Sequence, residues 1–435
     1  MCSETSKNNV DYKNTLSLPE TDFPMRAGLP TREPVWLEHW EKLDIYNTLR
    51  KRTGRKPFIL HDGPPYANGN LHIGHALNKI LKDMVVRSQQ MLGNDAPYIP
   101  GWDCHGLPIE WKIEEKYRQK GKDKDDIPII DFRQECRNFA SDWVKIQKEE
   151  FKRLGVIGNW ENPYLTMDFS AEAVIAEEFQ KFLMNGALFQ GSKPVMWSPV
   201  EKTALAEAEI EYHDHKSDTI WVPFKIIKGS KALENVKIVI WTTTPWTIPS
   251  NKAIAYNKDI SYGIYVVKET QQESWTKVND LYVIANSLAE ETLTKARVTK
   301  FQKIQNVNND ELNEAICSHP FNALQDAHGF WDYDVPIIEG DHVTEEAGTG
   351  FVHTAPSHGA DDYDCFVKRG WIDRLTHNIG EASEFLSHVP FFADLKVFNH
   401  KGKEGDANKA VINKLVEADS LIARGRLIHS YPHSW

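Results

Sequence analysis

Apolar residues recur at helical spacing along the first third of the chain. The period of about 3.6 predicts helices over residues 36–49, 73–92 and 132–154, and a further helix from about residue 107. Gly93 and Gly155 supply stop signals for two of them. The short apolar runs "KPFILHDG" and "APYIPGWD" predict buried strands between the helices. This alternation predicts a parallel, Rossmann-like, doubly wound sheet, in which ligands bind beyond the carboxyl ends of the strands.

The pattern changes at about residue 192. Runs such as "DTIWVPFKI", "VKIVIWTTTP", "YGIYVV" and "DLYVIA" are short, rich in β-branched and aromatic residues, and separated by turn residues. They predict a second, β-rich domain. A chain of 435 residues is long enough for two or more domains.

Composition narrows the class of protein. The formal net charge of −11 argues against wholesale wrapping of nucleic acid, which usually needs a basic domain. Five scattered cysteines form no C-x-x-C pair, which is typical of a reduced cytoplasmic protein. The first residues, "MCSETSKNNV", have no apolar core for a signal peptide, and no apolar run is long enough to span a membrane. We therefore expect a cytoplasmic protein with no membrane partner.

The segment "HDGPPYANGNLHIGH", residues 61–75, combines glycines, prolines and histidines just before a predicted helix. Glycines at 63, 69 and 74 permit close approach of the backbone, and two prolines stiffen the loop. The unpaired N–H groups and positive dipole end at a helix start favour an anion. The helix that follows carries its apolar residues on one face: Ile73, Leu77, Ile80, Leu81, Met84 and Val85.

His72 and His75 lie one turn apart at the start of this helix. Both rings then point the same way and can donate N–H bonds to a phosphate, stabilising charge in an in-line displacement. On spacing alone, a pair of structural histidines at a helix start explains the pattern equally well.

A second group of polar residues stands in the β-rich half. "WTTTPWTIPSN" places three threonines at a strand end, which is also typical of an ordinary edge strand. "GTGFVHTAPSHGADDYD" follows about a hundred residues later with clustered His and Asp. Its spacing matches no common metal motif, so we expect no metal. The alternative is a hydrolytic pocket in which hydroxyls and an imidazole hold water against an ester.

Together, "PPYANGNLHIGHALNKILKD" and "PGWDCHGLPIE" resemble the class I aminoacyl-tRNA synthetases, in particular their isoleucine-specific branch. The resemblance implies a Rossmann-like catalytic domain that uses ATP with Mg²⁺ to join isoleucine to tRNA(Ile). It implies that His72 and His75 are catalytic and that the ATP site comprises Asn68, Gly69, His72, Gly74 and His75.

The same resemblance implies that Gly63 and Pro64 shape the amino-acid pocket and that Asp103 accepts the substrate ammonium. A carboxylate suits this task because every amino acid carries that cation. By its position alone, Asp103 is more readily a turn residue after a strand.

The two threonine- and histidine-bearing segments resemble the editing domain inserted into this branch. The resemblance implies a β-rich, mixed α+β barrel-like insertion with a hydrolytic site at Thr242, Thr243, Thr244, His353 and Asp362, the last as the ammonium anchor. Some relatives bind zinc through paired cysteines where this chain reads "VMWSPVEKTAL" and "SYPHSW"; no thiol stands there, so we expect no zinc.

On this resemblance, residues 1–56 form an N-terminal helical extension and 57–200 the first half of the catalytic domain. Residues 201–420 form the editing insertion, and 421–435 return toward the catalytic domain. The family's second ATP-site loop, with lysine and serine, and its anticodon-binding region are not found in this sequence. We therefore expect the N-terminal part of such a ligase, acting as a monomer. The alternative is a non-ligating, truncated tRNA-binding or editing module.

Overall fold

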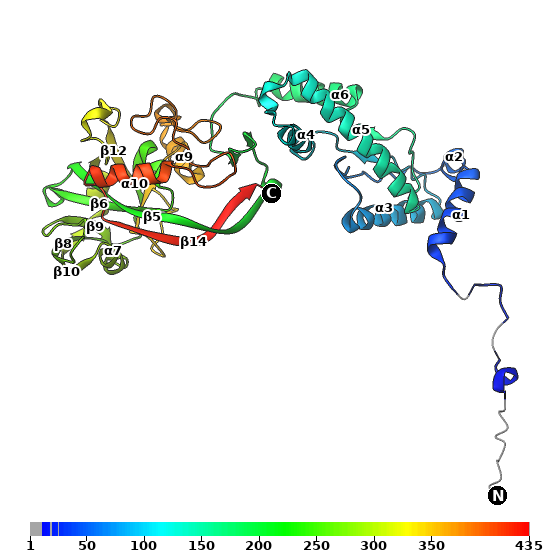
Figure 1. Ribbon diagram of the computed structural model, residues 1–435, viewed down its shortest axis with the longest axis horizontal. Coiled ribbons are helices and arrows are strands. Elements are labelled where there is room, and N and C mark those ends of the chain that lie inside the picture. The colour runs from blue at the N-terminus through cyan, green and yellow to red at the C-terminus, as the bar shows by residue number, and fades with distance from the viewer. Residues whose placement is uncertain (1–10, 18–19, 25, 435) are drawn as a thin grey trace, which may run out of the picture. The chain divides into compact units, whose positions relative to one another are not determined.

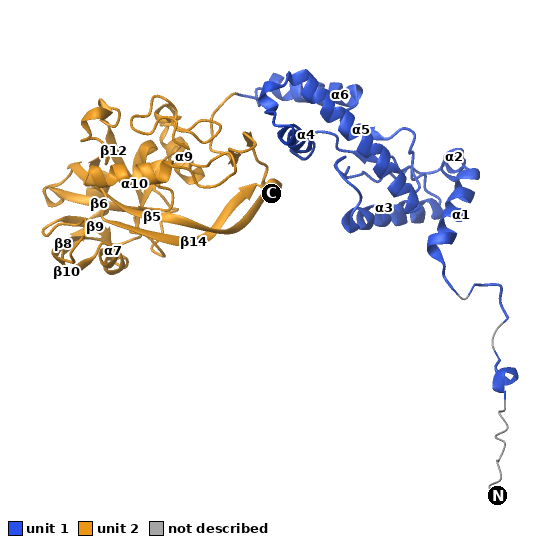
Figure 2. Ribbon diagram, in the orientation of Figure 1, with its two compact units in different colours: residues 1–189 blue, residues 190–435 orange. Residues whose placement is uncertain are grey.

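The computed structural model describes residues 11–17, 20–24 and 26–434. Cys2 and the first ten residues of the expected N-terminal extension lie outside this part. The chain divides into two compact units, residues 1–189 and 190–435, coloured blue and orange in Figure 2. The other four cysteines are buried and free. None of the described helices is both long enough and apolar enough to cross a membrane.

Unit 1 consists mainly of helices (Figure 1). The helices are α1 (Leu29–Lys42), α2 (Ile45–Arg50), α3 (Ile73–Met91), α4 (Leu107–Gln119), α5 (Ile129–Arg153) and α6 (Phe169–Met184). The predictions for α3, α4 and α5 are confirmed. The single helix predicted over residues 36–49 is wrong, because Asp44 adopts a left-handed conformation at φ 46° and separates α1 from α2. Aspartate is one of the few residues other than glycine that visit this region routinely.

The apolar face of α3 is exposed within unit 1. Leu81 is 52% exposed, whereas Lys79 on another face is only 2% exposed. The face of α3 that carries Lys79 is the buried one, because the Lys79 ammonium forms an ion pair with the carboxylate of Asp62 inside the unit. An amphipathic pattern identified the helix here but not the side that packs.

The parallel pairing predicted for unit 1 is present only in short pieces within the described residues. Strands β1 (Gly101–Trp102) and β2 (Tyr164–Leu165) pair in parallel. Single parallel bridges join Pro57 to Asp95 and Tyr66 to Asp103. The run "KPFILHDG" forms no strand beyond its bridge. Parallel strands gain stability from neighbours on both edges and helices on both faces, and this small set lacks those neighbours.

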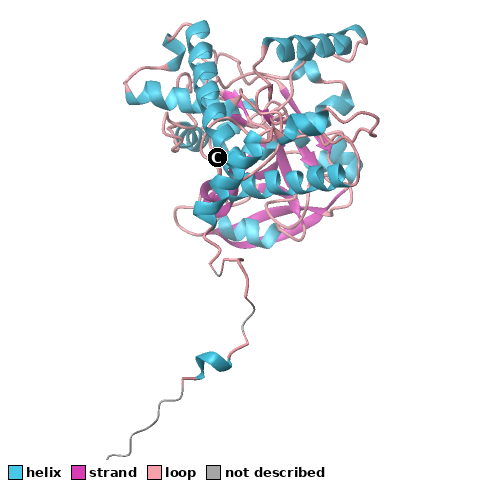
Figure 3. Cartoon of the chain, turned by 90° about the vertical axis from the view of Figure 1, so that its right-hand side faces the viewer, coloured by secondary structure: helices cyan, strands magenta, loops and turns pink. Residues whose placement is uncertain are grey.

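Unit 2 is built on a ten-stranded mixed sheet. Strands are drawn in magenta in Figure 3. Its strands are β5 (Ile210–Lys228), β6 (Val236–Thr242), β7 (Ala253–Tyr256), β8 (Tyr262–Thr270), β9 (Leu281–Ala285), β10 (Val298–Val307), β11 (Ile316–Ser318), β12 (Asp334–Glu339), β13 (Phe351–Thr354) and β14 (Ala423–Ser434). The hairpin β3 (Trp197–Ser198) and β4 (Thr203–Ala204) precedes it. Helices are α7 (Ala289–Lys295), α8 (Asn309–Asn313), α9 (Ala360–Arg369) and α10 (Ala407–Glu417). Short 3₁₀ helices in the two units span Tyr12–Thr15, Lys124–Asp126, Glu207–Glu209, Lys231–Leu233, Pro245–Ser250 (η5), Gln325–Ala327 and Ile372–Arg374.

The sheet of unit 2 closes into a ring. Strands β6, β13, β7, β12, β11 and β5 pair in that order, and β5 returns to pair with β6. Closure removes the free edges that an open sheet exposes. Strand β6, which carries the threonines at its end, therefore pairs on both sides and is not an edge strand. The β-rich second domain predicted from residue 192 is confirmed.

Pairing within the ring positions polar residues next to one another. Val352 of β13 pairs with Trp241 of β6, so His353 and Thr242 belong to adjacent strand positions. The other side of β6 pairs with β5, where Ile220 stands opposite Thr242. Helix α10 packs against η5, the segment that follows the threonines.

Candidate functional site

The loop between Asp62 and α3 is held in place by backbone pairing. The Asp103 N–H donates to the Pro65 carbonyl at 2.8 Å, and the Ala67 N–H donates to the Asp103 carbonyl at 2.9 Å. On its other side, the buried Gln147 amide donates to the carbonyls of Tyr66 and Gly69 at 3.0 and 2.7 Å. The loop is therefore fixed beside the residue predicted to bind an ammonium.

His72 and His75 cap the start of α3. Nδ1 of His72 accepts from the Gly74 N–H at 3.1 Å, and Nδ1 of His75 accepts from the His72 N–H at 3.3 Å. The rings stack with centroids 3.8 Å apart. Because both Nδ1 atoms are acceptors, each neutral ring carries its proton on Nε2. Burial, His72 and Lys79 together lower the pKa of His75, which favours this neutral form.

Asp103 pairs with the loop through its backbone and keeps part of its carboxylate accessible. Its side chain is 28% exposed; Thr166 Oγ1 donates to Oδ1 at 3.4 Å, and His105 Nδ1 lies 3.6 Å from the same oxygen without a hydrogen bond. No lysine or arginine of the described residues pairs with it. Gly63 is exposed and Asn68 half-buried at the same loop. The site thus combines imidazole N–H donors at the helix start with a partly exposed carboxylate that no described lysine or arginine neutralises.

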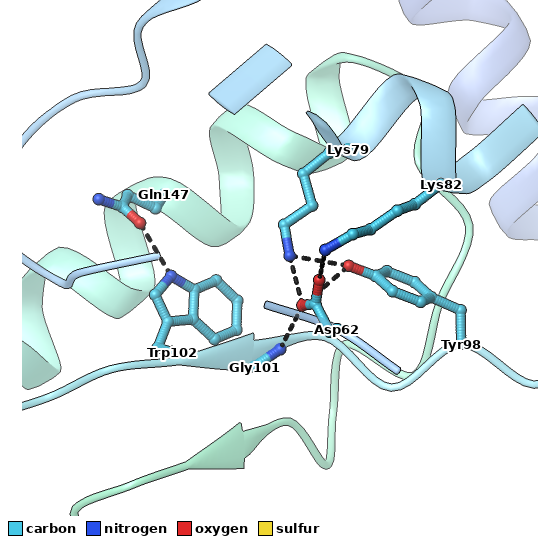
Figure 4. Close-up of polar contacts among 7 residues, drawn as sticks. All are labelled: Asp62, Lys79, Lys82, Tyr98, Gly101, Trp102 and Gln147. Atoms are coloured by element: carbon cyan, nitrogen blue, oxygen red, sulfur yellow. Dashed lines mark hydrogen bonds and ion pairs between the residues drawn. The ribbon is translucent and has the colours of Figure 1, made fainter. Parts of the chain in front are cut away.

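Asp62 fixes the start of this loop through its carboxylate (Figure 4). The sequence analysis did not select this residue. Its carboxylate accepts from Lys79, from Lys82 at 2.5 Å, and from the Tyr98 hydroxyl and Gly101 N–H at 3.1 Å each. Burial alone acts to raise the pKa of Asp62, but the two ammonium groups outweigh it and lower the pKa. The carboxylate therefore joins the loop, α3 and the strand that leads to Asp103.

A second set of polar residues in unit 2 comes from the end of β6, from η5 and the residues that flank it, and from β13. Asn251 Nδ2 lies 2.8 Å from His353 Nδ1, and His353 Nε2 lies 2.8 Å from Thr247 Oγ1. Thr247 Oγ1 lies 3.2 Å from Thr244 Oγ1, which lies 3.1 Å from Thr242 Oγ1. The structure thus joins three of the predicted residues, Thr242, Thr244 and His353, into one hydrogen-bonded chain.

Two predicted residues are outside this chain. Thr243 is half-buried between its two bonded neighbours. Asp362, at the start of α9, accepts from the N–H of Ala355, two residues after His353, at 2.8 Å. Burial raises the pKa of Asp362 to about 6, so that a bound cation would be needed to keep it fully charged in mild acid. No hydrogen bond joins Asp362 to the threonines.

Asn251 and Thr247 are functional candidates that sequence reasoning did not select. Both stand inside the quoted run "WTTTPWTIPSN", but their side chains face the buried interior, which a strand-end pattern does not reveal. Among the described residues, no group of three or more His, Cys, Asp or Glu side chains is arranged to hold a metal ion. The expectation of no zinc stays a prediction.

Comparison with known proteins gives one family and a set of close relatives. Residues 35–318 match the family model of class I tRNA synthetases (I, L, M and V). The chain is 56% identical to an isoleucine–tRNA ligase of Ruegeria pomeroyi and 52% identical to one of Rhodopseudomonas palustris. Each alignment covers all of this chain and 45% or 44% of the relative, so the chain spans less than half the length of the relatives it matches. A solved LeuRS–tRNA–LeuAMS complex from Agrobacterium radiobacter K84 is 16% identical over 94% of this chain and 48% of that one, with a TM-score of 0.36.

Proposed function

The chain belongs to the class I tRNA synthetase family, and from that premise we propose that it is the N-terminal part of an isoleucine–tRNA ligase. The observation that carries the proposal is the identity of 52–56% to relatives of that name along the whole chain. Those relatives carry ligase names, which favours a ligase over a non-ligating module. We propose that the longer protein acts in the cytoplasm as a monomer.

The loop of unit 1 suits the first step of that reaction. In our proposal Asp103 binds the isoleucine ammonium, Gly63 and Pro64 shape its pocket, and ATP enters as its Mg²⁺ complex beside Asn68, Gly69 and Gly74. The isoleucine carboxylate attacks the α-phosphorus, and the bond to pyrophosphate breaks. The Nε2–H groups of His72 and His75 donate to phosphate oxygens as their charge grows, so that they stabilise the transition state more than bound substrate.

The ring of unit 2 suits a second, hydrolytic step. Valine is smaller than isoleucine by one methylene. A binding pocket gains too little free energy from one methylene to reject valine by binding alone. We propose that unit 2 hydrolyses valyl-tRNA(Ile), with Thr242, Thr243, Thr244 and His353 at the ester and Asp362 at the ammonium. Water adds to the ester carbonyl, the bond to the ribose oxygen breaks, and tRNA and valine are released.

Isoleucine-dependent pyrophosphate exchange by the longer protein tests the ligase proposal. Replacing both His72 and His75 with alanine should lower kcat by about a hundredfold or more, the loss expected for transition-state donors, while KM for isoleucine changes little. Exchange at the wild-type rate in this double variant would remove the histidines from the proposed reaction. A wild-type protein that activates no isoleucine would contradict the ligase function itself.

A further inference from the structure

The chain of hydrogen bonds from Asn251 to Thr242 has a fixed direction, and Asn251 sets it. Asn251 is completely buried, and its Nδ2 lies 2.9 Å from the Ala253 carbonyl as well as 2.8 Å from His353 Nδ1. Since a carbonyl can only accept, this atom is the amide nitrogen, and its second hydrogen goes to His353. Nδ1 is therefore the acceptor, and the neutral ring carries its proton on Nε2.

The position of that proton determines the hydrogen-bond direction of every hydroxyl further along the chain of contacts. His353 Nε2–H donates to Thr247 Oγ1, and the Thr247 hydroxyl hydrogen goes to the Thr244 carbonyl at 2.8 Å. The contact of 3.2 Å between the hydroxyls of Thr244 and Thr247 then has Thr244 as its donor. By the same logic, the Thr242 hydroxyl donates to Thr244 Oγ1, while Thr242 Oγ1 accepts from the Thr244 N–H at 3.1 Å.

The hydroxyl hydrogens of Thr242, Thr244 and Thr247 are all used within the chain. A hydroxyl oxygen has two lone pairs. Thr247 Oγ1 has both occupied, by His353 and by Thr244, whereas Thr242 Oγ1 and Thr244 Oγ1 each keep one lone pair without a partner. Thr242, Thr244 and Thr247 therefore offer acceptors and no donors to a molecule that approaches them.

We propose that Thr242 and Thr244 hold the hydrolytic water by accepting its hydrogens, and that Thr247 is the positioning residue that gives the two hydroxyls this polarity. The inference rests on the proposed editing function and specifies how its site works. A water that donates to both oxygens presents its own lone pair outward, toward the ester carbonyl carbon. As the new C–O bond forms and the ester C–O bond breaks, one water proton passes to the ribose oxygen, and valine loses the other to solvent.

The same hydrogen-bond directions exclude Thr242 and Thr244 as donors to the ester carbonyl oxygen. The carbonyl oxygen of the ester becomes negative during attack and needs hydrogen-bond donors. Thr242 and Thr244 have none to give, so those donors must come from elsewhere. His353 is likewise not a general base here, because its Nδ1 is occupied and its Nε2 is protonated.

Burial of His353 keeps these hydrogen-bond directions the same over a wide range of pH. Burial lowers the pKa of His353 to about 3, and the nearby His358 further disfavours its protonation. His319 is buried as well and His358 is half-buried, and desolvation lowers their pKa values to about 3 and about 4. All three imidazoles thus stay neutral across the range in which the enzyme would be assayed, and the direction of the chain does not reverse.

Two variants of Thr247 test the proposal in the 435-residue chain. Thr247→Val keeps the shape but removes the hydroxyl, whereas Thr247→Ser keeps the hydroxyl. We expect Thr247→Val to lower kcat for valyl-tRNA hydrolysis by about 10- to 100-fold, the effect of losing a buried hydrogen bond, with KM nearly unchanged. Thr247→Ser should stay within about threefold of wild type. Thermal unfolding of both variants checks that the fold is kept.

Ring ¹⁵N spectra test the polarity without any assay of activity. The His353 signals, assigned by comparison with His353→Gln, should show a proton on Nε2 and none on Nδ1 from pH 5 to pH 9. A proton on Nδ1, or titration of His353 in that range, would overturn the proposal whether or not Thr247→Val folds. So would Thr247→Val hydrolysis at the wild-type rate. A wild-type chain that hydrolyses no valyl-tRNA would instead contradict the editing function, and the inference would fall with it.

Discussion

The two units solve the problem of burying apolar surface in different ways. Unit 2 closes its sheet into a ring, and the hydroxyls, the imidazole and the amide nitrogen of its proposed site bond to one another and to the backbone. Within its described residues, unit 1 has only two-residue strands and leaves apolar side chains of α3 and α6 exposed, with Ile73 and Met184 among the most exposed. Exposed apolar surface of this kind is unusual in a domain that functions alone. From this difference we predict that the proposed site of unit 2 is preassembled within this chain, whereas the fold of unit 1 depends on a few buried polar contacts.

The largest effect is expected where unit 1 depends on one carboxylate. Asp62→Ala leaves Lys79 buried without its counter-ion and should destabilise unit 1 by about 3–5 kcal/mol. Urea unfolding, followed by hydrogen exchange of α3 and of β6 separately, reports each unit. The matched control is Lys42→Ala, which breaks the exposed pair with Glu38 and should cost less than about 1 kcal/mol. Equal effects of the two variants would refute the role given to Asp62.

In unit 2, replacing the carboxylate of Asp362 should stabilise the fold, whereas replacing that of Asp62 should destabilise unit 1. Asp362 has its pKa raised from 3.8 to about 6, so the folded state binds a proton more tightly than the unfolded state. The stability that unit 2 gains from binding this proton is complete below about pH 4 and is lost as the pH rises through 6. At pH 7 the charged group therefore destabilises unit 2, and Asp362→Asn should gain on the order of 3 kcal/mol, at roughly 1.4 kcal/mol per pKa unit.

The pH dependence of this gain is its check. Unfolding of wild type and Asp362→Asn at pH 7 and at pH 4 should show a clear difference at the higher pH and almost none at the lower. A difference that is the same at both values would mean that burial of the charge is not its cause.

The smallest effect is expected on the exposed face of α3. Leu81→Ala should change stability by no more than about 0.5 kcal/mol, because the side chain is already half in water. The same substitution at the fully buried Leu293 of unit 2 should cost about 2–5 kcal/mol. Denaturant midpoints of the two variants compare one chemical change in both units. A large loss at Leu81 would show that this face is packed in solution.

Sequence patterns predicted the elements better than their packing. Period and glycine stops identified α3, α4 and α5, since these signals are local. The burial of Lys79 instead of Leu81 could not be predicted, because it depends on Asp62, which is 17 residues away. The break at Asp44 was missed because an aspartate in a helical pattern gives no sign of its left-handed conformation.

The candidate sites divide in the same way. The motifs selected Thr242, Thr244 and His353, which the ring brings together. They did not select Thr247 or Asn251, whose importance comes from hydrogen bonds to His353 more than a hundred residues away. The domain boundaries expected at residues 200 and 421 and the roles of the site residues stay predictions. The structure itself divides between residues 189 and 190.

The central claim is that unit 2 contains a complete hydrolytic site within this chain. A deacylation time course of the 435-residue chain with valyl-tRNA(Ile) and isoleucyl-tRNA(Ile), at low salt to favour tRNA binding, tests it most directly. We predict that valyl-tRNA is consumed while isoleucyl-tRNA is spared, and that Asp362→Ala slows the reaction about 10- to 100-fold by leaving the substrate ammonium unpaired. Undiminished hydrolysis by Asp362→Ala, or equal loss of both aminoacyl-tRNAs, would contradict the account.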